Sequence, residues 1–369
     1  MNTILHNGKR IALALLAVLT AFSSCKKDKN NSPDPGTLTT TGVYVLCEGS
    51  FGELNNSSIS YYDIARNTVD KNYFRTQNGT DLGTDANDLK VYGSKLYCVV
   101  TGSAAAAKDS YLQVINVATG KLIKKIAFSD ATKGFMPRSI VFYQNKAYVS
   151  GYDGYISKLD TASLTIESRL LVGGALEGLA TANGKLYAAN SSHPFYPSEN
   201  NSSVSVVNIS TFTKVKDIEV SFNPTKVAAS AAGDVFVITS GQWAPYIAPA
   251  FEKLSSQADT KTQTYDDNLA ALTISGSNGY AITGDYPAKL KTFNTATATT
   301  GPDFITDDTV VASLYGVNVN TLDGNVFVAD ATDYKGDGKM FCFDSSGKWK
   351  FDFATGTSPK IAVFNYGYK

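Results

Sequence analysis

The segment SSHPFYPSEN, residues 191–200, contains His193, the only histidine outside the N-terminal leader. A histidine that acts in acid–base or nucleophilic catalysis needs a positioned serine, cysteine or carboxylate as its partner. The chain has no GxSxG or HExxH motif to supply that pairing, and one histidine does not build a typical metal site. We therefore expect no catalytic residue, no metal and no cofactor. His193 is either a ligand contact or a solvated loop residue.

Aromatic side chains surround His193 and recur at intervals along the chain. Trp and Tyr offer a large contact area and a polar group at little entropic cost, so a concave surface of such residues suits flat or ring-shaped ligands. The alternative is that individual rings only fill the centre of the fold or anchor long loops. The aromatic and histidine candidates for ligand contact are Phe51, Tyr152, His193, Phe195, Tyr196, Trp243, Tyr246, Tyr286 and Tyr334.

Polar residues that precede the repeated segments form a second group of candidates, namely Asn87, Arg138 and Glu177. Arg138, Lys226 and Lys360 each come shortly after a proline, at related places in a repeat. One interpretation is that these charges only follow the repeat and point into solvent. The other is that they form a ring of donors for amide or phosphate groups of a ligand.

A short pattern with a central aromatic residue recurs along the whole chain and defines the elements that carry these candidates. Its aromatic residues are Tyr44, Tyr97, Tyr148, Tyr187, Phe236, Tyr280 and Phe327. They are roughly 40 to 53 residues apart, which is the length of one propeller blade. Each follows an apolar segment and a Gly/Asn/Asp turn, and each precedes an alternating segment such as SISYYD or YISKLD.

This pattern predicts an all-β fold, a seven-bladed β-propeller of four-stranded antiparallel blades. The first repeat begins at its second strand, whereas the C-terminal SPKIAVF, residues 358–364, parallels MPRSIVF at residue 136. We therefore expect the C-terminal strand to complete blade one and close the ring. The long loops between strands two and three of the blades, which carry the aromatic candidates, would then share one face.

The N-terminal residues predict export. Lys9 and Arg10 precede an apolar run from Ile11 to Phe22 that is too short to span a membrane, so residues 1–24 are interpreted as a signal peptide. Cys25 follows small residues, as in the lipobox of bacterial lipoproteins, and is the expected site of lipidation. Residues 25–41 are polar and rich in Pro, Gly, Ser and Thr, which indicates a flexible tether, and residues 42–369 form the predicted propeller.

Charge and cysteine content exclude several classes. Lys plus Arg and Asp plus Glu number 33 each, so no basic field exists to bind nucleic acid. Cys47, Cys98 and Cys342 lie in apolar runs without metal-binding spacing. They are interpreted as buried thiols, with one disulfide as the alternative.

Three segments carry a resemblance to a known family: GVYVLCEGSFGELNNSSISYYD, VFVADATDYKGDGKMFCFD and FATGTSPKIAVF. They resemble the YncE-like seven-bladed propeller surface lipoproteins, a group that includes the cobalamin-binding BtuG proteins. The Lys-Lys-Asp run after Cys25 similarly resembles a surface-export signal. The resemblance implies a monomeric outer-membrane lipoprotein, exposed at the cell surface and held by its lipid alone.

The function expected from these observations is non-enzymatic binding. The aromatic face would capture a small molecule, with cobalamin or another corrinoid as the most specific candidate from the resemblance. A TonB-dependent outer-membrane transporter would then receive the ligand. The alternative is a propeller scaffold that binds a surface glycan or a partner protein, because a propeller face serves either purpose.

Overall fold

A computed structural model describes residues 36–369 of the chain. The predicted signal peptide, Cys25 and most of the predicted tether lie outside the described residues. Leu38–Gly367 form one compact unit; Thr37 and Lys369 belong to another and exchange two backbone hydrogen bonds of 2.8 and 3.1 Å. Within residues 36–369, no helix is long and apolar enough to span a membrane.

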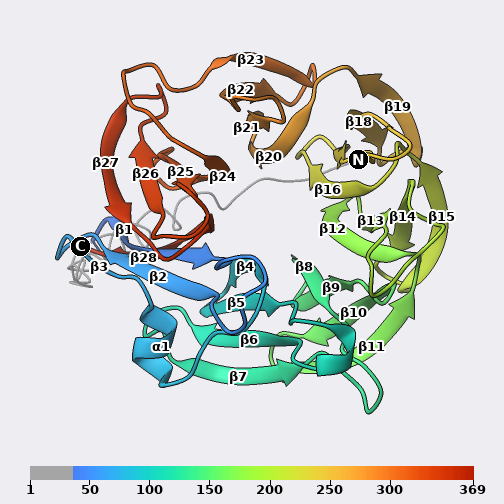
Figure 1. Cartoon of the computed structure of the whole chain (residues 1–369), viewed down its shortest axis with the longest axis horizontal. Helices are drawn as coiled ribbons and strands as arrows, with labels where there is room; N and C mark the ends of the chain where they lie inside the picture. Colours follow the sequence, from blue (N-terminus) through green and yellow to red (C-terminus); the bar gives the residue numbers. More distant parts are fainter. Residues whose placement is uncertain (1–35) are drawn as a thin grey trace, which may run out of the picture. The chain divides into compact units, whose positions relative to one another are not determined.

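Seven four-stranded antiparallel sheets follow one another around a central opening, which confirms the predicted propeller (Figure 1). Blade one contains, from the centre outward, β28 (Pro359–Tyr368), β1 (Leu38–Cys47), β2 (Ser58–Asp63) and β3 (Thr68–Asp70). Helix α1 (Tyr73–Asn78) leads to blade two, which contains β4 (Ala86–Tyr92), β5 (Lys95–Val100), β6 (Tyr111–Asn116) and β7 (Leu122–Ala127). The loop between β5 and β6 includes the short 3-10 helix η1 (Ala105–Ala107).

The remaining blades repeat this order. Blade three contains β8 (Pro137–Tyr143), β9 (Lys146–Gly151), β10 (Tyr155–Asp160) and β11 (Thr165–Leu171). Blade four contains β12 (Ala175–Ala182), β13 (Lys185–Ser191), β14 (Ser203–Asn208) and β15 (Thr213–Glu219). Blade five contains β16 (Pro224–Ala229), β17 (Asp234–Thr239), β18 (Ala250–Ser255) and β19 (Thr260–Tyr265).

Blades six and seven complete the set. Blade six contains β20 (Leu269–Ser275), β21 (Asn278–Thr283), β22 (Leu290–Asn294) and β23 (Thr299–Asp303). Blade seven contains β24 (Leu314–Val319), β25 (Val326–Asp330), β26 (Lys339–Phe343) and β27 (Trp349–Ala354).

The C-terminal strand closes the ring as predicted. β28 lies beside β1 as the innermost strand of blade one, and β1 starts at Leu38, inside the stretch assigned to the tether. The Glu48 N–H donates to the Ser358 carbonyl at 3.0 Å, and the Thr41 hydroxyl donates to the Asn365 carbonyl at 3.2 Å. The two ends of the propeller are therefore joined by backbone pairing.

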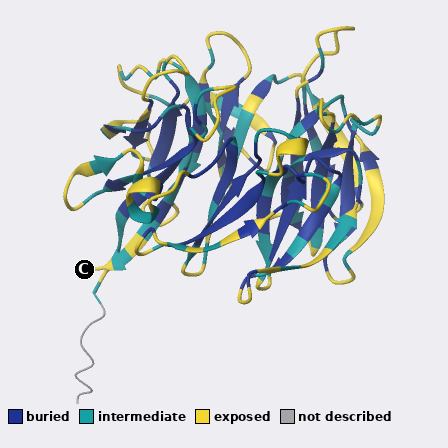
Figure 2. Ribbon diagram, turned by 60° about the horizontal axis from the view of Figure 1, so that its bottom comes forward, coloured by how far each residue is buried: buried dark blue, intermediate teal, exposed yellow. Residues whose placement is uncertain are grey.

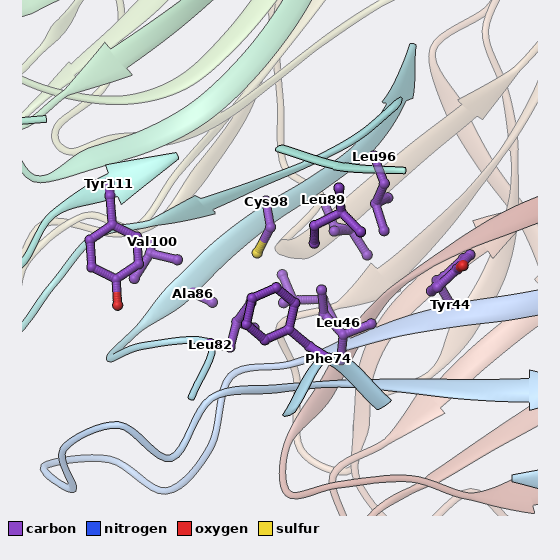
Figure 3. Close-up of a cluster of buried hydrophobic side chains, with 12 residues drawn as sticks. Tyr44, Leu46, Phe74, Leu82, Ala86, Leu89, Leu96, Cys98, Val100 and Tyr111 are labelled. Carbon is purple, nitrogen blue, oxygen red and sulfur yellow. The ribbon is translucent and has the colours of Figure 1, made fainter. Parts of the chain in front are cut away.

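The cores between blades are apolar, and the repeated aromatic residues anchor them. The strands are buried along their middles and the connecting loops are exposed (Figure 2). Between blades one and two, Phe74 of α1 packs with Leu46, Leu82 and Leu89 (Figure 3). Tyr44 is buried in the same cluster, and its hydroxyl donates to the Val117 carbonyl in blade two at 2.8 Å.

Tyr187 makes the equivalent link from blade four to blade five, because its hydroxyl donates to Asp259 Oδ1 at 2.6 Å. At these two interfaces the adjoining blades are thus held by both apolar packing and a tyrosine hydroxyl. Cys47, Cys98 and Cys342 are buried and unpaired, in agreement with the interpretation as inert thiols. Burial raises the pKa of the Cys98 thiol, so it stays protonated.

Candidate functional site

A β-bulge recurs near the start of the inner strands. The pairing shifts between Ala86 and Asp88 in β4, and it shifts at the equivalent place in β8, β12, β16, β20 and β24. At a β-bulge, two residues of one strand lie opposite a single residue of the partner strand. The bulge thereby changes the direction of a side chain that regular pairing would leave in the ladder. Repetition of the bulge in successive blades therefore places a set of side chains around the central opening.

We call the residues at this place the bulge ring: Asn87, Arg138, Glu177, Thr225, Ala270, Tyr315 and, at the matching position after Pro359 in β28, Lys360. All of them line one cavity of about 550 Å³, which we call the central funnel. Next along the inner strands, Asp88, Ser139, Lys226 and Ala271 also line it. The inner strands thus carry a polar lining in most blades and alanines in blade six.

Arg138 connects blades two, three and four. Its Nε donates to Glu177 Oε2 at 2.9 Å, and a terminal nitrogen donates to Asp85 Oδ2 at 3.3 Å. The Tyr152 hydroxyl donates to the other Glu177 oxygen at 2.6 Å. Burial alone would raise the pKa of Glu177, but the charge of Arg138, the hydrogen bond from Tyr152 and the charge of Lys226 together hold that pKa below its usual value. Glu177 is therefore an ionised carboxylate with both oxygens engaged.

Glu48 similarly connects blades seven and one through its hydrogen bonds. Its two oxygens accept hydrogen bonds from the Lys360 ammonium and the Tyr315 hydroxyl. Burial alone would raise the pKa of Glu48, but the charge and hydrogen bond of Lys360 and the hydrogen bond from Tyr315 together hold it below its usual value, so the carboxylate is ionised. Lys360 also lies 3.4 Å from Asn87 Oδ1, which extends the contacts into blade two.

Lys226 differs from these paired charges. Within residues 36–369 it forms no hydrogen bond and no ion pair, although it lines the funnel. The positive charge of Lys360, followed by burial, lowers the pKa of Lys226 to about 8. The Lys226 side chain is exposed, and it faces the water-accessible space of the funnel. The polar contacts described above therefore end at Glu177 in blade four and resume at Tyr315 in blade seven.

A second cavity, which we call the rim pocket, adjoins the funnel. It has a volume of about 490 Å³ and includes Phe51, His193 and Phe195, with Glu48 and Asp85 among its polar groups. Tyr315 and Tyr334 line both cavities, and their rings meet edge to face at 5.5 Å. The two cavities thus share an aromatic wall.

His193 stacks on Tyr152, with ring centroids 4.0 Å apart and planes inclined by 17°. Its Nδ1 accepts the Phe195 N–H at 3.3 Å. Burial, followed by the charge of Arg138, lowers the pKa of His193, which favours a neutral imidazole at pH 7. The His193 imidazole that lines the rim pocket is therefore uncharged. Over residues 36–369, no group of three His, Cys, Asp or Glu side chains could hold a metal ion.

The predicted site residues fall into three groups. Asn87, Arg138, Glu177 and Tyr334 line the funnel, while Phe51, His193, Phe195 and again Tyr334 line the rim pocket. Tyr152 is buried and the Tyr196 hydroxyl donates to the Gly134 carbonyl, so both rings take part in packing. Trp243, Tyr246 and Tyr286 line neither cavity and are 91%, 69% and 102% exposed.

Two central residues, Glu48 and Tyr315, were not among the predicted contacts. Tyr315 occupies in blade seven the place that Arg138 occupies in blade three, so alignment of the repeats on the bulge would have found it. Glu48 directly follows β1 and carries no repeat signal. In blade five, Thr225 takes the Arg138 position, and Lys226 lies one residue further along.

The fold and its lined funnel define a seven-bladed β-propeller with a concave site at its centre. The chain belongs to the DUF5074 family, described as a domain of unknown function, whose model matches residues 41–368. No curated protein of similar sequence is found.

Solved structures with the same fold include a quinonprotein alcohol dehydrogenase-like protein from Bacteroides thetaiotaomicron VPI-5482. It is 13% identical over 89% of this chain and 79% of that chain, with a TM-score of 0.62. Dihydro-heme d1 dehydrogenase NirN, solved in complex with DHE, is 12% identical over 89% and 75%, with a TM-score of 0.56. The computationally designed Ika8 protein is 12% identical over 88% and 89%, with a TM-score of 0.54. At these identities the likeness concerns the fold alone.

Proposed function

We propose that this protein is a non-enzymatic binding propeller that captures a small molecule in the central funnel and the rim pocket. The observation that carries the proposal is the junction of the two cavities at Tyr315 and Tyr334. Each cavity is within the range of about 300 to 1,000 Å³ that is usual for small-molecule sites. Aromatic rings on one side and fixed polar groups on the other suit a ligand with a flat body and polar substituents.

Cobalamin is the most specific candidate ligand, and the resemblance to the YncE-like lipoproteins is its main support. Its flat ring would lie against Phe51, Phe195 and Tyr334, and its amides would bond to the polar lining. In this proposal Cys25 carries the lipid anchor and the protein lies at the surface of the outer membrane. It would act as a monomer that passes its ligand to a TonB-dependent transporter.

Calorimetric titration of the full chain with cyanocobalamin tests this proposal. We expect sub-micromolar 1:1 binding, at or beyond about −8 kcal/mol. Tyr334→Ala should weaken binding, because Tyr334 belongs to both cavities, whereas Trp349→Ala, an exposed ring on β27, is the matched control. Absence of heat at tens of micromolar protein would eliminate cobalamin.

A second candidate function is supported by the exposed rings of blades five and six. Trp243 and Tyr246 lie in the β17–β18 loop and Tyr286 lies in the neighbouring β21–β22 loop. Exposed Trp and Tyr are typical of surfaces that bind a glycan or a partner protein. The double substitution Trp243→Ala and Tyr246→Ala should leave cyanocobalamin binding intact if this patch serves a separate partner. Loss of cyanocobalamin binding would instead assign the patch to the small-molecule site.

A further inference from the structure

The cations of the central funnel outnumber its acids. Its lining includes the bases Lys90, Arg138, Lys226 and Lys360, but only the acids Asp88 and Glu177. Two acids outside this lining make the numbers equal, but neither pairs with Lys226, because Asp85 pairs with Arg138 and Glu48 pairs with Lys360. Lys90 lies 3.5 Å from Asp88. Lys226 is thus the lining cation, over residues 36–369, without an acidic partner within ion-pair distance.

No nearby acid is free to rotate toward Lys226. Glu177 on β12 attracts its charge, yet one Glu177 oxygen accepts from Arg138 and the other from Tyr152. Glu48 is engaged in the same way by Lys360 and Tyr315. An ammonium group that lines a concave cavity without an acidic partner attracts an anion, because a charge-assisted hydrogen bond is stronger than a neutral one.

The wall next to Lys226 has space for such an anion. In blade six the bulge ring and the following position hold Ala270 and Ala271, whereas blade seven holds Tyr315 and blade three holds Arg138. Both alanines line the funnel. The volume that a large side chain fills in other blades is therefore left to the cavity here.

We propose that Lys226 is an anion-binding residue that holds a carboxylate or phosphate group of the molecule in the central funnel, with Lys360 adding a second positive charge. This site rests on the proposed function and extends it, because it requires the ligand to carry a negatively charged group and to bind in one orientation. The anionic group would lie between blades five and six, and the flat part of the ligand would extend toward Tyr315 and Tyr334. A ligand without a negatively charged group would leave the positive charge of Lys226 without a counter-charge.

Proton linkage gives this site a pH dependence. The charged groups with the largest effect on Lys226 are Lys360 on β28, Glu177 on β12, Arg138 on β8 and Glu48 after β1. An anion stabilises the protonated lysine and so raises its pKa above the value of about 8 that it has without ligand. Affinity for the anion should consequently fall as pH rises through about 8.

Competitive acetylation of the full chain tests the site directly. Acetic anhydride reacts with neutral amines, so the yield at Lys226, followed by peptide mass spectrometry against pH, reports its protonation. Inorganic phosphate and malonate are the probes, at about 20 mM to detect millimolar affinity, with potassium chloride at equal ionic strength as reference. We expect about tenfold slower acetylation of Lys226 for a pKa rise of one unit. Lys216, exposed on β15, is the internal control and should not change.

The outcomes separate the sources of the anion. Protection by phosphate alone assigns a phosphate group, protection by malonate alone assigns a carboxylate, and protection by both supports the shared chemistry. Equal acetylation in phosphate, malonate and chloride overturns the proposal. A Lys226→Met variant with unchanged melting temperature should lose anion-induced thermal stabilisation, and Lys226→Arg should retain it.

The same samples distinguish this site from the proposed function. If cyanocobalamin binds the full chain but neither anion protects Lys226, the lysine site is wrong and the binding propeller stands. If the anions protect Lys226 and cyanocobalamin does not bind, the lysine site stands and cobalamin is eliminated.

Discussion

Arg138 in blade three and Lys226 in blade five both stand near the start of an inner strand that begins with proline, but their surroundings differ. Arg138 is held by Glu177 and Asp85, and its side chain is 14% exposed. Lys226 has no such partner over residues 36–369. The comparison teaches that neighbouring positions at the start of equivalent inner strands can carry either a charge that is paired within the fold or a charge without an acidic partner. The residues on the adjoining blades make this difference.

The largest loss of stability should come from breaking the ion pair between Arg138 and Glu177. Arg138→Met would leave Glu177 buried without its counter-charge, a change that typically costs about 3 to 5 kcal/mol of unfolding free energy. Denaturant unfolding followed by circular dichroism measures it. Retention of wild-type stability would show that the ion pair does not hold blades three and four together.

Low pH should weaken the ion pairs that Glu48 and Glu177 form with Lys360 and Arg138. The folded-state pKa values of Glu48 and Glu177 are lowered by Lys360 and Arg138, so their stabilisation is present above the unfolded pKa and is lost as pH falls through the folded values. Unfolding free energy should decline below about pH 4.5. In Glu177→Gln we expect a loss of about 2 kcal/mol at pH 7 and a shallower decline in acid. An unchanged acid slope in this variant would remove Glu177 from the explanation.

A pair of buried tyrosines tests the distinction between a paired and an unpaired hydroxyl group. The Tyr187 hydroxyl bonds to Asp259, whereas the Tyr97 hydroxyl, in the described part of the chain, has no partner. Tyr187→Phe should cost about 1 to 2 kcal/mol, while Tyr97→Phe should be neutral or stabilising. Thermal melts of the two variants, measured side by side, give the difference. Equal losses would mean that ring packing, and not the hydroxyl, distinguishes these positions.

The smallest change in stability is expected for substitution of Lys226, which has no acidic partner over residues 36–369. Lys226→Met removes a charge that Lys360 repels, so stability should change by less than about 0.5 kcal/mol, possible gains included. Denaturant unfolding under the conditions used for Arg138→Met provides the contrast. A loss as large as that of Arg138→Met would show that Lys226 supports the fold.

The sequence predicts the fold well because propeller structure is local and repeated. Each blade has its own aromatic strand and turn, and the unpaired start of blade one together with SPKIAVF at the end predicts ring closure. Such patterns need no knowledge of distant contacts.

The candidate site is predicted only in part, because its geometry depends on bulges and on loop directions. Sequence periodicity cannot show that the inner strands shift register, so Tyr315 and the offset between Thr225 and Lys226 were missed. Tyr152 and Trp243 are both aromatic and both follow a second strand, yet one is buried and the other is 91% exposed. Only tertiary packing separates them.

Ring closure by β28 also means that blade one cannot be completed before the chain has been synthesised through residue 368. Synthesis makes β1 early and its inner partner last, so a nascent chain has an unpaired strand edge until its final residues leave the ribosome. Bringing ends so far apart together has an entropic cost on the order of 5 kcal/mol, which the completed blade must offset. Blades two to seven have all their strands before blade one does. For the exported chain proposed above, this delay leaves the ring open while the polypeptide is still being translocated.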